Sequence, residues 1–537
     1  MRRLDRSIGI RLKKNGLTNP LQPTILVSVN EPMKRSNSLV DGIHLDRDAA
    51  QPLYAQLATA LRERIQSGRL AGGQKLPSTR EVAEKLGINR ATIVEAYRLL
   101  RDEGWVRSGV GAGTFVVGPQ DRTPAEPDGA GASFWSTRLN ELPRPEPGRA
   151  PIQPPAGTIR LTSPTADPDG FPVAEFRDVL DEVFRREGSR CLDYGPPDGY
   201  APLRELIATR LAGQDIDIDP ARVILVNGSQ QGLELIFRLL VPRGRVLLLE
   251  EPTYNLAIRT ARALRLPMRS VPMDEDGLKL DALERLIDEV DAGMLYTMPV
   301  FQNPTGLSLS RDRRARLLTL ASARGLPIVE DHFDAELDYR GDGPRPLLAE
   351  GRSPNVVLIG TFSKVLFPGL RVGWLVVPEP LIGPLSETKV CADLSGGLLT
   401  QMALHEFCRR GLLDAHLTRV RARNSARLAA MLDALDSHMP GGTRWTKPTG
   451  GMCLWLWLPR GLDADSLALE ALRRGVAISS GTNFHVDGGG RDALRLCFVR
   501  EGEVRIREGI RLLAQIIEEE IARLPGRDLE GAAAPIL

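Results

Sequence analysis

One lysine in the long C-terminal part of the chain has surroundings that suit covalent chemistry. Lys364 lies between small hydroxyl residues in Gly360-Thr-Phe-Ser-Lys364, directly after a β-rich run. Burial at a strand end and a nearby cation such as Arg371 lower the pKa of an amine, which then attacks carbonyl groups more readily. Lysine is also scarce between residues 160 and 525, where it occurs at Lys279, Lys364, Lys389 and Lys447. Lys364 is therefore the candidate for a Schiff base.

Other strand-end positions supply the remaining groups that pyridoxal phosphate requires. Asp331 offers a carboxylate for the ring nitrogen, Tyr254 an aromatic ring for stacking, and Asn303 a donor to the phenolic oxygen. Arg495 offers a bidentate clamp for a substrate carboxylate, and the turn Asn227-Gly-Ser-Gln-Gln231 opens a helix whose free amides can hold a phosphate. Each residue alone has an ordinary structural role, but the complete set predicts a pyridoxal phosphate site.

The elements that must position these residues alternate between β-rich runs and helical stretches. This order predicts an α/β domain with a mainly parallel sheet, in which ligands bind beyond the carboxyl ends of the strands. The expected strands are 223–226, 246–249, 294–298, 328–331, 356–359 and 374–377.

A different pattern occupies the N-terminal part. Leucine and isoleucine recur every four residues from Leu53 to Ile65, which predicts an amphipathic helix. Ser78 and Glu81 form a capping box that opens a second helix, and Asn89 caps a third. After Gly104, residues 105–107 and 114–117 can pair as a hairpin across a glycine-rich turn. We therefore expect a winged helix-turn-helix.

In a helix-turn-helix, the first turn of the recognition helix enters the major groove of double-stranded DNA. Arg90 and Thr92 would then face base edges, and Ser78 and Arg80 would lie near phosphates. From the pattern alone, three packed helices with solvated arginines remain an alternative.

Charge and composition divide the chain into parts. Residues 1–117 carry 19 Lys and Arg against 11 Asp and Glu, a net charge of +8, whereas residues 118–537 carry 51 against 57, a net charge of −6. We expect a basic extension at 1–43, a winged helix at 44–117, a proline-rich linker at 118–159, a cofactor-binding domain at 160–525 and a flexible tail at 526–537. The five cysteines are dispersed, which indicates neither a disulfide framework nor a metal site.

The N-terminal motifs resemble a known family of DNA-binding domains. The segments Pro52-Leu-Tyr-Ala-Gln-Leu57, Gly72-Gly-Gln-Lys-Leu-Pro-Ser-Thr-Arg80, Asn89-Arg-Ala-Thr-Ile-Val-Glu-Ala-Tyr97 and Glu103-Gly-Trp105 are similar to the winged helix of GntR-family transcription regulators over residues 51–117. The resemblance implies that Arg80, Arg90, Thr92 and the wing residue Gly111 contact DNA.

The C-terminal motifs resemble fold-type I, class I and II aminotransferases over residues 160–525. They are Tyr194-Gly-Pro-Pro-Asp-Gly-Tyr200, Gly228-Ser-Gln-Gln-Gly232, Glu251-Pro-Thr-Tyr254, Gln302-Asn-Pro-Thr-Gly306, Glu330-Asp331, Gly360-Thr-Phe-Ser-Lys364 with Arg371, and Gly450-Gly-Met452. A fusion of the two domains is similar to the MocR-type regulators.

This second resemblance implies a role for each matching residue. Lys364 would form the aldimine with pyridoxal phosphate, Asp331 would bind the pyridine nitrogen and Tyr254 would stack on the ring. The residues implied for the phosphate are Ser229, Gln230, Thr361 and Arg371, joined in a homodimer by Tyr194 of the other subunit.

The sequence departs from the family pattern two residues after Asp331. Relatives often have a tyrosine there that bonds the phenolic oxygen, whereas this chain has Phe333. Asn303 can still supply one bond, so we expect cofactor binding with a less polarised aldimine. His332 fits either a supporting role for Asp331 or simple burial in the core.

Two main functions remain open from the sequence. The first is a transcription regulator that binds a DNA operator and senses a small amino compound, or pyridoxal phosphate itself, through Lys364. The second is a working aminotransferase with an accessory winged helix. A regulator with a cofactor-free relic domain is a third reading, and it requires Lys364 to be idle. The chain lacks an apolar run long enough for a membrane span and a secretory signal, so a cytoplasmic protein is expected.

Overall fold

The computed structural model describes residues 43, 45–46, 52–67, 69–102, 105–109, 113–117, 154–341, 343–350 and 355–524. The chain forms two compact units, Met1–Leu142 and Pro143–Leu537. Most of the expected linker, and both expected terminal extensions apart from residue 43, lie outside the described residues.

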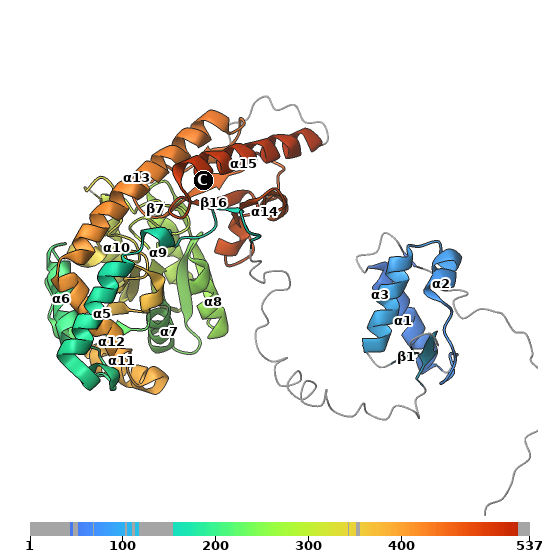
Figure 1. Cartoon of the computed structure of the whole chain (residues 1–537), viewed down its shortest axis with the longest axis horizontal. Helices are drawn as coiled ribbons and strands as arrows, with labels where there is room; N and C mark the ends of the chain where they lie inside the picture. Colours follow the sequence, from blue (N-terminus) through green and yellow to red (C-terminus); the bar gives the residue numbers. More distant parts are fainter. Residues whose placement is uncertain are drawn as a thin grey trace, which may run out of the picture. The chain divides into compact units, whose positions relative to one another are not determined.

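The described residues of the N-terminal unit form three helices and a two-stranded sheet (Figure 1). Its helices are α1 (Leu53–Gln66), α2 (Thr79–Leu86) and α3 (Arg90–Asp102), and strand β1 (Val106–Gly109) pairs antiparallel with β2 (Gly113–Val116). Leu57, Leu61, Ile93 and Leu100 are fully buried between the helices. The helical period of these residues therefore builds a core shared by α1 and α3.

The C-terminal unit is built on an eight-stranded sheet in the order β4-β11-β10-β9-β8-β5-β6-β7. Apart from the antiparallel strands β7 and β11, the strands run in one direction. This confirms the expected α/β fold. The strands are β4 (Val223–Val226), β5 (Val246–Glu251), β6 (Met268–Asp274), β7 (Gly277–Leu278), β8 (Ala292–Thr297), β9 (Ile328–Asp331), β10 (Val356–Thr361) and β11 (Gly373–Val376).

Helices cover both faces of this sheet, because successive side chains of a strand point to opposite sides. Leu247 and Leu249 of β5 pack in one apolar cluster with residues of α7 and α8, whereas Leu248 packs in another with residues of α9 and α10. The helices are α5 (Val173–Glu187), α6 (Ala201–Ala212), α7 (Ser229–Leu240), α8 (Asn255–Ala263), α9 (Leu280–Glu289), α10 (Arg311–Arg324), α11 (Glu379–Asp393), α12 (Leu398–Arg409), α13 (Leu412–His438), α14 (Ala464–Arg473) and α15 (Glu503–Arg523).

A smaller sheet near the end of the chain has the order β12-β13-β16-β15. Its strands are β12 (Arg444–Trp445), β13 (Cys453–Trp457), β15 (Ser479–Ser480) and β16 (Ala493–Cys497), while β3 (Ile159–Arg160) pairs with β14 (Val476–Ala477). The long helices α13 and α15 pack against each other beside this sheet (Figure 1). This part of the fold positions Arg495 on β16.

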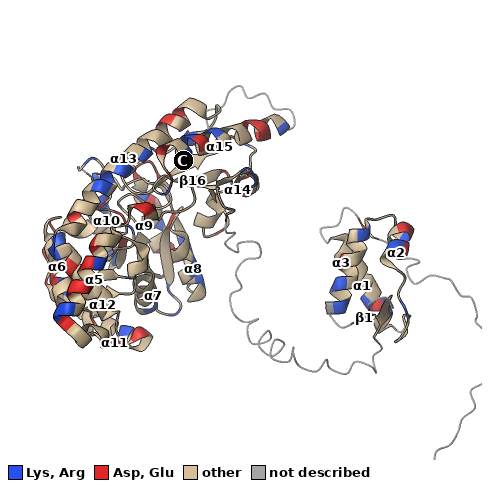
Figure 2. Cartoon of the chain, viewed as in Figure 1, with Lys and Arg blue, Asp and Glu red and all other residues tan. Residues whose placement is uncertain are grey.

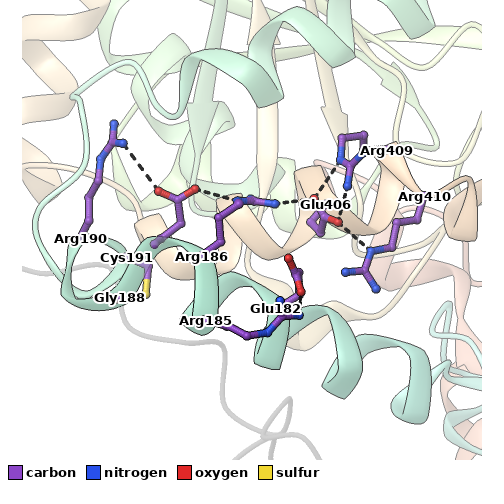
Figure 3. Close-up of polar contacts among 10 residues, drawn as sticks. Glu182, Arg185, Arg186, Gly188, Arg190, Cys191, Glu406, Arg409 and Arg410 are labelled. Carbon is purple, nitrogen blue, oxygen red and sulfur yellow. Dashed lines mark hydrogen bonds and ion pairs between the residues drawn. The ribbon is translucent and has the colours of Figure 1, made fainter.

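A group of ion pairs joins α5 to α12 (Figure 3). The fully buried carboxylate of Glu406 binds Arg409 and Arg410 at 2.7 Å and Arg186 of α5 at 3.0 Å. These arginine bonds outweigh burial and hold the pKa of Glu406 well below its usual value. The bonds to Glu406 fix the end of α5, just before the segment that leads to Tyr194.

Within the described part of the chain, no helix combines the length and the apolar character that crossing a membrane would need.

Candidate functional site

The two central candidates lie at the carboxyl ends of neighbouring parallel strands. Asp331 is the last residue of β9, and Lys364 follows the end of β10 by three residues. Ile359 of β10 is the register partner of Asp331. The sheet therefore brings to one edge two residues that are 33 positions apart in the sequence, as the strand pattern predicts.

The carboxylate of Asp331 is buried, and only one of its two oxygens accepts a hydrogen bond from the described residues. The hydroxyl of Tyr296 on β8 donates to Oδ2 at 2.7 Å, whereas Oδ1 is buried without a hydrogen-bond partner. Burial raises the pKa of Asp331 to about 6, although the Tyr296 hydroxyl and the charge of Lys364 act in the opposite direction. Oδ1 is thus an acceptor held ready for a donor that the described residues do not supply.

Lys364 has the environment of a reactive amine. Its Nζ donates to the carbonyl oxygen of Pro164 at 2.9 Å. Burial and the positive charge of Arg495 lower the pKa of Lys364, and the carboxylates of Asp334 and Asp331 oppose this effect. A lowered pKa raises the fraction of neutral amine, which is the nucleophilic form.

The expected phosphate residues surround the N-terminus of α7. Gly228 precedes this helix with φ of 80° and provides no side-chain cap, so the first amides of Ser229 and Gln230 lack a side-chain acceptor there. Arg371 donates to the carbonyl oxygen of Asn227 at 2.9 Å, and a Cβ at Gly228 would lie 2.5 Å from its guanidinium. The helix terminus and this guanidinium together form an anion-binding cradle.

The side chains of two further phosphate candidates, Thr361 and Gln230, form hydrogen bonds to neighbouring polar groups. The Thr361 hydroxyl donates to Ser363 Oγ at 3.0 Å and accepts the Ser363 amide at 3.1 Å, so the two hydroxyls act as a pair after β10. Gln230 donates to the Thr260 hydroxyl at 2.5 Å, while its buried Oε1 has no hydrogen-bond partner among the residues that the structure describes. The structure therefore adds Ser363 and Thr260 to the set, as supports for Thr361 and Gln230.

Arg495 is a buried arginine with a polar side and an aromatic side. It donates to Asn303 Oδ1 at 3.0 Å and to the Thr162 carbonyl oxygen at 2.7 Å. Its guanidinium lies 4.6 Å from the centroid of the Phe484 ring, which supports it as a cation–π partner. Within the described residues Arg495 bonds the neutral oxygens of Asn303, Thr162 and Ser479 and its Nε has no partner, which leaves its positive charge available for an anionic ligand. Because Asn303 accepts through its oxygen, its amide nitrogen faces elsewhere as a donor.

The two tyrosines lie in contrasting places. Tyr254 is half-buried at the N-terminus of α8, where burial and the charge of Asp331 raise the pKa of its hydroxyl. Tyr194 lies in the segment before α6 with 79% of its surface exposed. No contact brings Tyr194 to the other candidates within the described chain, which is the arrangement expected of a residue that serves another subunit.

Sequence reasoning missed Tyr296 and Asp334. Tyr296 lies on a predicted strand, but its bond to Asp331 depends on the pairing of β8 with β9. Asp334 follows Asp331 by three residues and is buried, and in the described part of the chain neither of its carboxylate oxygens has a hydrogen-bond partner. Burial raises the pKa of Asp334 well above its usual value. The burial of Asp334 had no sequence signal, because a carboxylate in a turn after a strand is usually solvated.

In the N-terminal unit, the predicted capping residues do cap helices. Ser78 Oγ accepts the Glu81 amide and the Glu81 carboxylate accepts the Ser78 amide, which completes the capping box of α2. Asn89 Oδ1 accepts the Ala91 amide at 2.9 Å at the start of α3. These bonds fix the ends of both helices of the helix-turn-helix.

The predicted DNA-contacting residues lie around the same two helix ends. Arg80 and Arg90 are exposed, Thr92 is half-buried, and Arg90 Nε donates to the Thr79 hydroxyl at 3.3 Å. Basic residues continue along α3 (Figure 2). The wing residue Gly111 lies outside the described residues.

The residues at the sheet edge fit pyridoxal phosphate by their own chemistry. Asp331 Oδ1 matches a protonated ring nitrogen, the α7 cradle with Arg371 matches a phosphate, and Lys364 matches an aldehyde. The close approach of Gly373 to Gly228 and Ser229, where a Cβ would lie 2.8 Å from backbone atoms, holds the cradle in shape. Phe333 offers no donor, as expected.

Comparison with known proteins identifies both units. The family model described as aminotransferase class I and II matches residues 165–506, and that described as bacterial regulatory proteins, gntR family, matches residues 53–116. The HTH-type transcriptional regulator YisV of Bacillus subtilis is 30% identical over 87% of this chain and 96% of its own. The probable rhizopine catabolism regulatory protein MocR of Rhizobium meliloti is 30% identical over 81% of this chain and 87% of its own.

A solved structure covers the C-terminal unit alone. The α-aminoadipate aminotransferase LysN of Thermus thermophilus, complexed with N-(5'-phosphopyridoxyl)-L-leucine, is 36% identical, covers 69% of this chain and 94% of its own, and superposes with a TM-score of 0.65. The two-domain relatives and the aminotransferase-like unit agree with the motif-based resemblance. The chain therefore belongs to the class I and II aminotransferase family and, through its GntR-type winged helix, to the MocR-type transcription regulators.

Proposed function

We propose that this regulator uses its pyridoxal phosphate site to sense a small primary amine that carries a carboxylate. The observation that carries the proposal is the combination of a nucleophilic Lys364 with a buried Arg495 that has no carboxylate partner among the described residues. When bound, pyridoxal phosphate supplies an aldehyde that condenses with primary amines and a ring that withdraws electrons. Arg495 adds selection for a carboxylate.

Each residue of the site has a distinct task in this proposal. Asp331 would hold a proton on the ring nitrogen through Oδ1, and Tyr254 would supply the aromatic surface for the ring. The amides of Ser229 and Gln230, the Thr361 hydroxyl and Arg371 would bind the phosphate. Asn303 donates to the phenolic oxygen while its own oxygen keeps Arg495 in place at 3.0 Å. Lys364 is the residue that meets the aldehyde.

The proposed assembly is a homodimer bound to a double-stranded DNA operator. The exposed Tyr194 would complete the phosphate site of the partner subunit. Two winged helices in one dimer reach two half-sites, so the second contact benefits from a raised effective concentration. Arg90 and Thr92 would read bases, with Ser78, Asn89 and Arg80 at the helix ends near phosphates.

Replacement of Lys364 tests the sensing site. Purified protein should carry a visible absorbance band from bound cofactor, and borohydride should fix the cofactor to the peptide that contains Lys364. Lys364→Ala should lose this fixation, whereas Lys447→Ala, at an exposed lysine paired with Asp436, should retain it. Fixation to another lysine in the Lys364→Ala protein would contradict the proposal.

A specific observation also supports a second function, that of a working aminotransferase. Lys364, Asp331 and Asn303 are all present, and Asn303 bonds Arg495 through its oxygen and not through its amide nitrogen. Incubation with an amino donor and a 2-oxo acid separates the two functions. Multiple turnovers would favour the enzyme, whereas a change in DNA affinity without turnover would favour the sensor.

A further inference from the structure

Two of the five cysteines lie directly opposite each other beneath the predicted carboxylate clamp. Cys453 on β13 and Cys497 on β16 are register partners in the smaller sheet, and both are buried. In the sequence they are separated by 44 positions with no Cys-x-x-Cys motif. The antiparallel pairing of the two strands is what brings them together.

The backbone bonding identifies the kind of pair. The Cys497 amide donates to the Leu161 carbonyl oxygen at 2.8 Å, away from β13. Cys453 and Cys497 therefore form a non-hydrogen-bonded pair, in which the Cα atoms lie about 4.5 Å apart and the side chains approach closely. This separation falls within the range of about 4.4 to 6.8 Å that a disulfide spans.

The two thiols already interact with each other. Cys453 Sγ donates to the Pro304 carbonyl oxygen at 3.5 Å, and the adjacent Cys497 thiol together with burial raises the pKa of Cys453. Burial also acts to raise the pKa of Cys497, but the adjacent Cys453 thiol and the positive charges of Arg495 and Lys364 outweigh it and lower the pKa. A thiol that ionises more readily is the one that a small oxidant attacks first.

We propose that Cys453 and Cys497 are a redox-responsive pair that forms a cross-strand disulfide under peroxide. The Cys497 thiolate attacks the peroxide, the O–O bond breaks, and a sulfenic acid and one water form. The Cys453 sulfur then attacks the sulfenic sulfur and expels the second water. The two thiols lose two electrons and two protons, and the peroxide is reduced to two waters.

The bond would act on the clamp because each cysteine supports one side of it. Cys497 lies two residues after Arg495 on the same face of β16, and Cys453 Sγ contacts the Pro304 carbonyl oxygen at 3.5 Å, next to Asn303. A disulfide moves Cys453 Sγ towards β16 and away from Pro304. It also removes the negative charge that Cys497 can place near Lys364. Oxidation therefore changes the surroundings of both Arg495 and Lys364.

The first experiment measures the bond itself and does not depend on a bound cofactor. Full-length protein is treated with hydrogen peroxide, alkylated under denaturing conditions and mapped by peptide mass spectrometry. We expect one linked peptide pair containing Cys453 and Cys497, lighter by two hydrogen atoms and restored by dithiothreitol. Cys453→Ser and Cys497→Ser should each abolish it, whereas Cys191→Ser and Cys408→Ser, at other buried cysteines, should not.

Two results would overturn this assignment. One is a disulfide that joins other cysteines in the native protein. The other is irreversible oxidation of Cys497 with Cys453 still alkylated, because the pair would then be too far apart to react. Both results can be measured by mass spectrometry in the original protein. Misfolding of a serine variant therefore does not affect the conclusion.

The second experiment tests the coupling to the site, and this step rests on the proposed function. The absorbance of bound cofactor is recorded before oxidation, after it and after dithiothreitol, with the Cys453→Ser protein as control. We expect a reversible spectral shift in the original protein and no reversible shift in the control. A disulfide formed without any spectral change would refute the coupling. If the protein binds no cofactor, the proposed function fails, but the mass measurement still tests the disulfide.

Discussion

The strongest test of the site geometry is the single available oxygen of Asp331. Oδ2 already accepts the Tyr296 hydroxyl at 2.7 Å, so Oδ1 is the atom left for the ring nitrogen of pyridoxal phosphate. Asp331→Asn keeps the size of the side chain but removes its charge. The loss is one hydrogen bond to a charged group, about 1.5 to 3 kcal/mol. Because 1.4 kcal/mol is a factor of ten, cofactor affinity should fall roughly 10- to 150-fold.

The pH dependence gives the same test a second readout. Burial raises the pKa of Asp331 to about 6 in the empty protein, so below this pH the carboxyl group is neutral before the cofactor binds. Pairing with a protonated ring nitrogen requires the ionised carboxylate, and binding must then release a proton. Affinity should therefore decline as the pH falls through about 6 in the original protein, and this component should be absent in Asp331→Asn.

The assay is a titration of cofactor-depleted protein with pyridoxal phosphate, followed by absorbance across this pH range. The cofactor phosphate titrates in both proteins, so the difference between the two pH profiles isolates Asp331. Asp436→Asn, at a 56% exposed aspartate on α13, is the matched control and should leave the dissociation constant unchanged. Equal affinity and equal pH profiles for Asp331→Asn and the original protein would refute the assignment of Oδ1 to the ring nitrogen.

Three further changes probe other parts of the chain. Arg90→Ala should weaken operator binding by about 1 to 3 kcal/mol and relax specificity in a gel-shift competition, whereas Arg98→Ala, at an arginine paired with Glu95, should not relax it. Arg495→Ala should reduce the affinity for a carboxylate-bearing amine roughly 10- to 150-fold but leave that for the decarboxylated amine unchanged, as measured by cofactor absorbance. Glu406→Gln should lower the free energy of unfolding at neutral pH by about 1 to 3 kcal/mol, because three arginines lose a buried partner but reach water. Since the folded pKa of Glu406 is lowered, its contribution is present above about pH 4.3 and is lost at lower pH, so the two denaturation curves should converge in acid.

Local patterns predicted the elements of this protein well. Runs of buried aliphatic residues located β4, β9 and β10 almost to the residue, because both faces of a parallel strand are buried and the run is continuous. The capping box at Ser78 also appeared as expected, since it depends on residues three positions apart. Strand-end residues such as Asp331 and Lys364 then followed from the rule that ligands bind at the carboxyl edge.

Features that depend on long-range pairing were not predicted. The bond from Tyr296 to Asp331 requires β8 to lie beside β9, and the Cys453–Cys497 pair requires the register of β13 and β16. Strand order and register are set by the whole core, so no short segment encodes them. The dispersed cysteines indicated no disulfide framework, and all five are free in the structure; only the strand register shows that Cys453 and Cys497 face each other. The place of Tyr194 depends on a second subunit and stays a prediction.

Linkage explains why a sensing site far along the chain can control DNA binding at all. An effector shifts the equilibrium between two arrangements of the dimer only by the difference in its affinity for them. Arg495 links that affinity to the segments around the site, because it bonds the Thr162 carbonyl near the start of the C-terminal unit as well as Asn303. The Pro164 carbonyl oxygen, in the same segment, accepts a hydrogen bond from the Lys364 amine. A carboxylate that engages Arg495 would compete with its bond to the Thr162 carbonyl oxygen, so an effector with a carboxylate would change the contacts of residues 162–164.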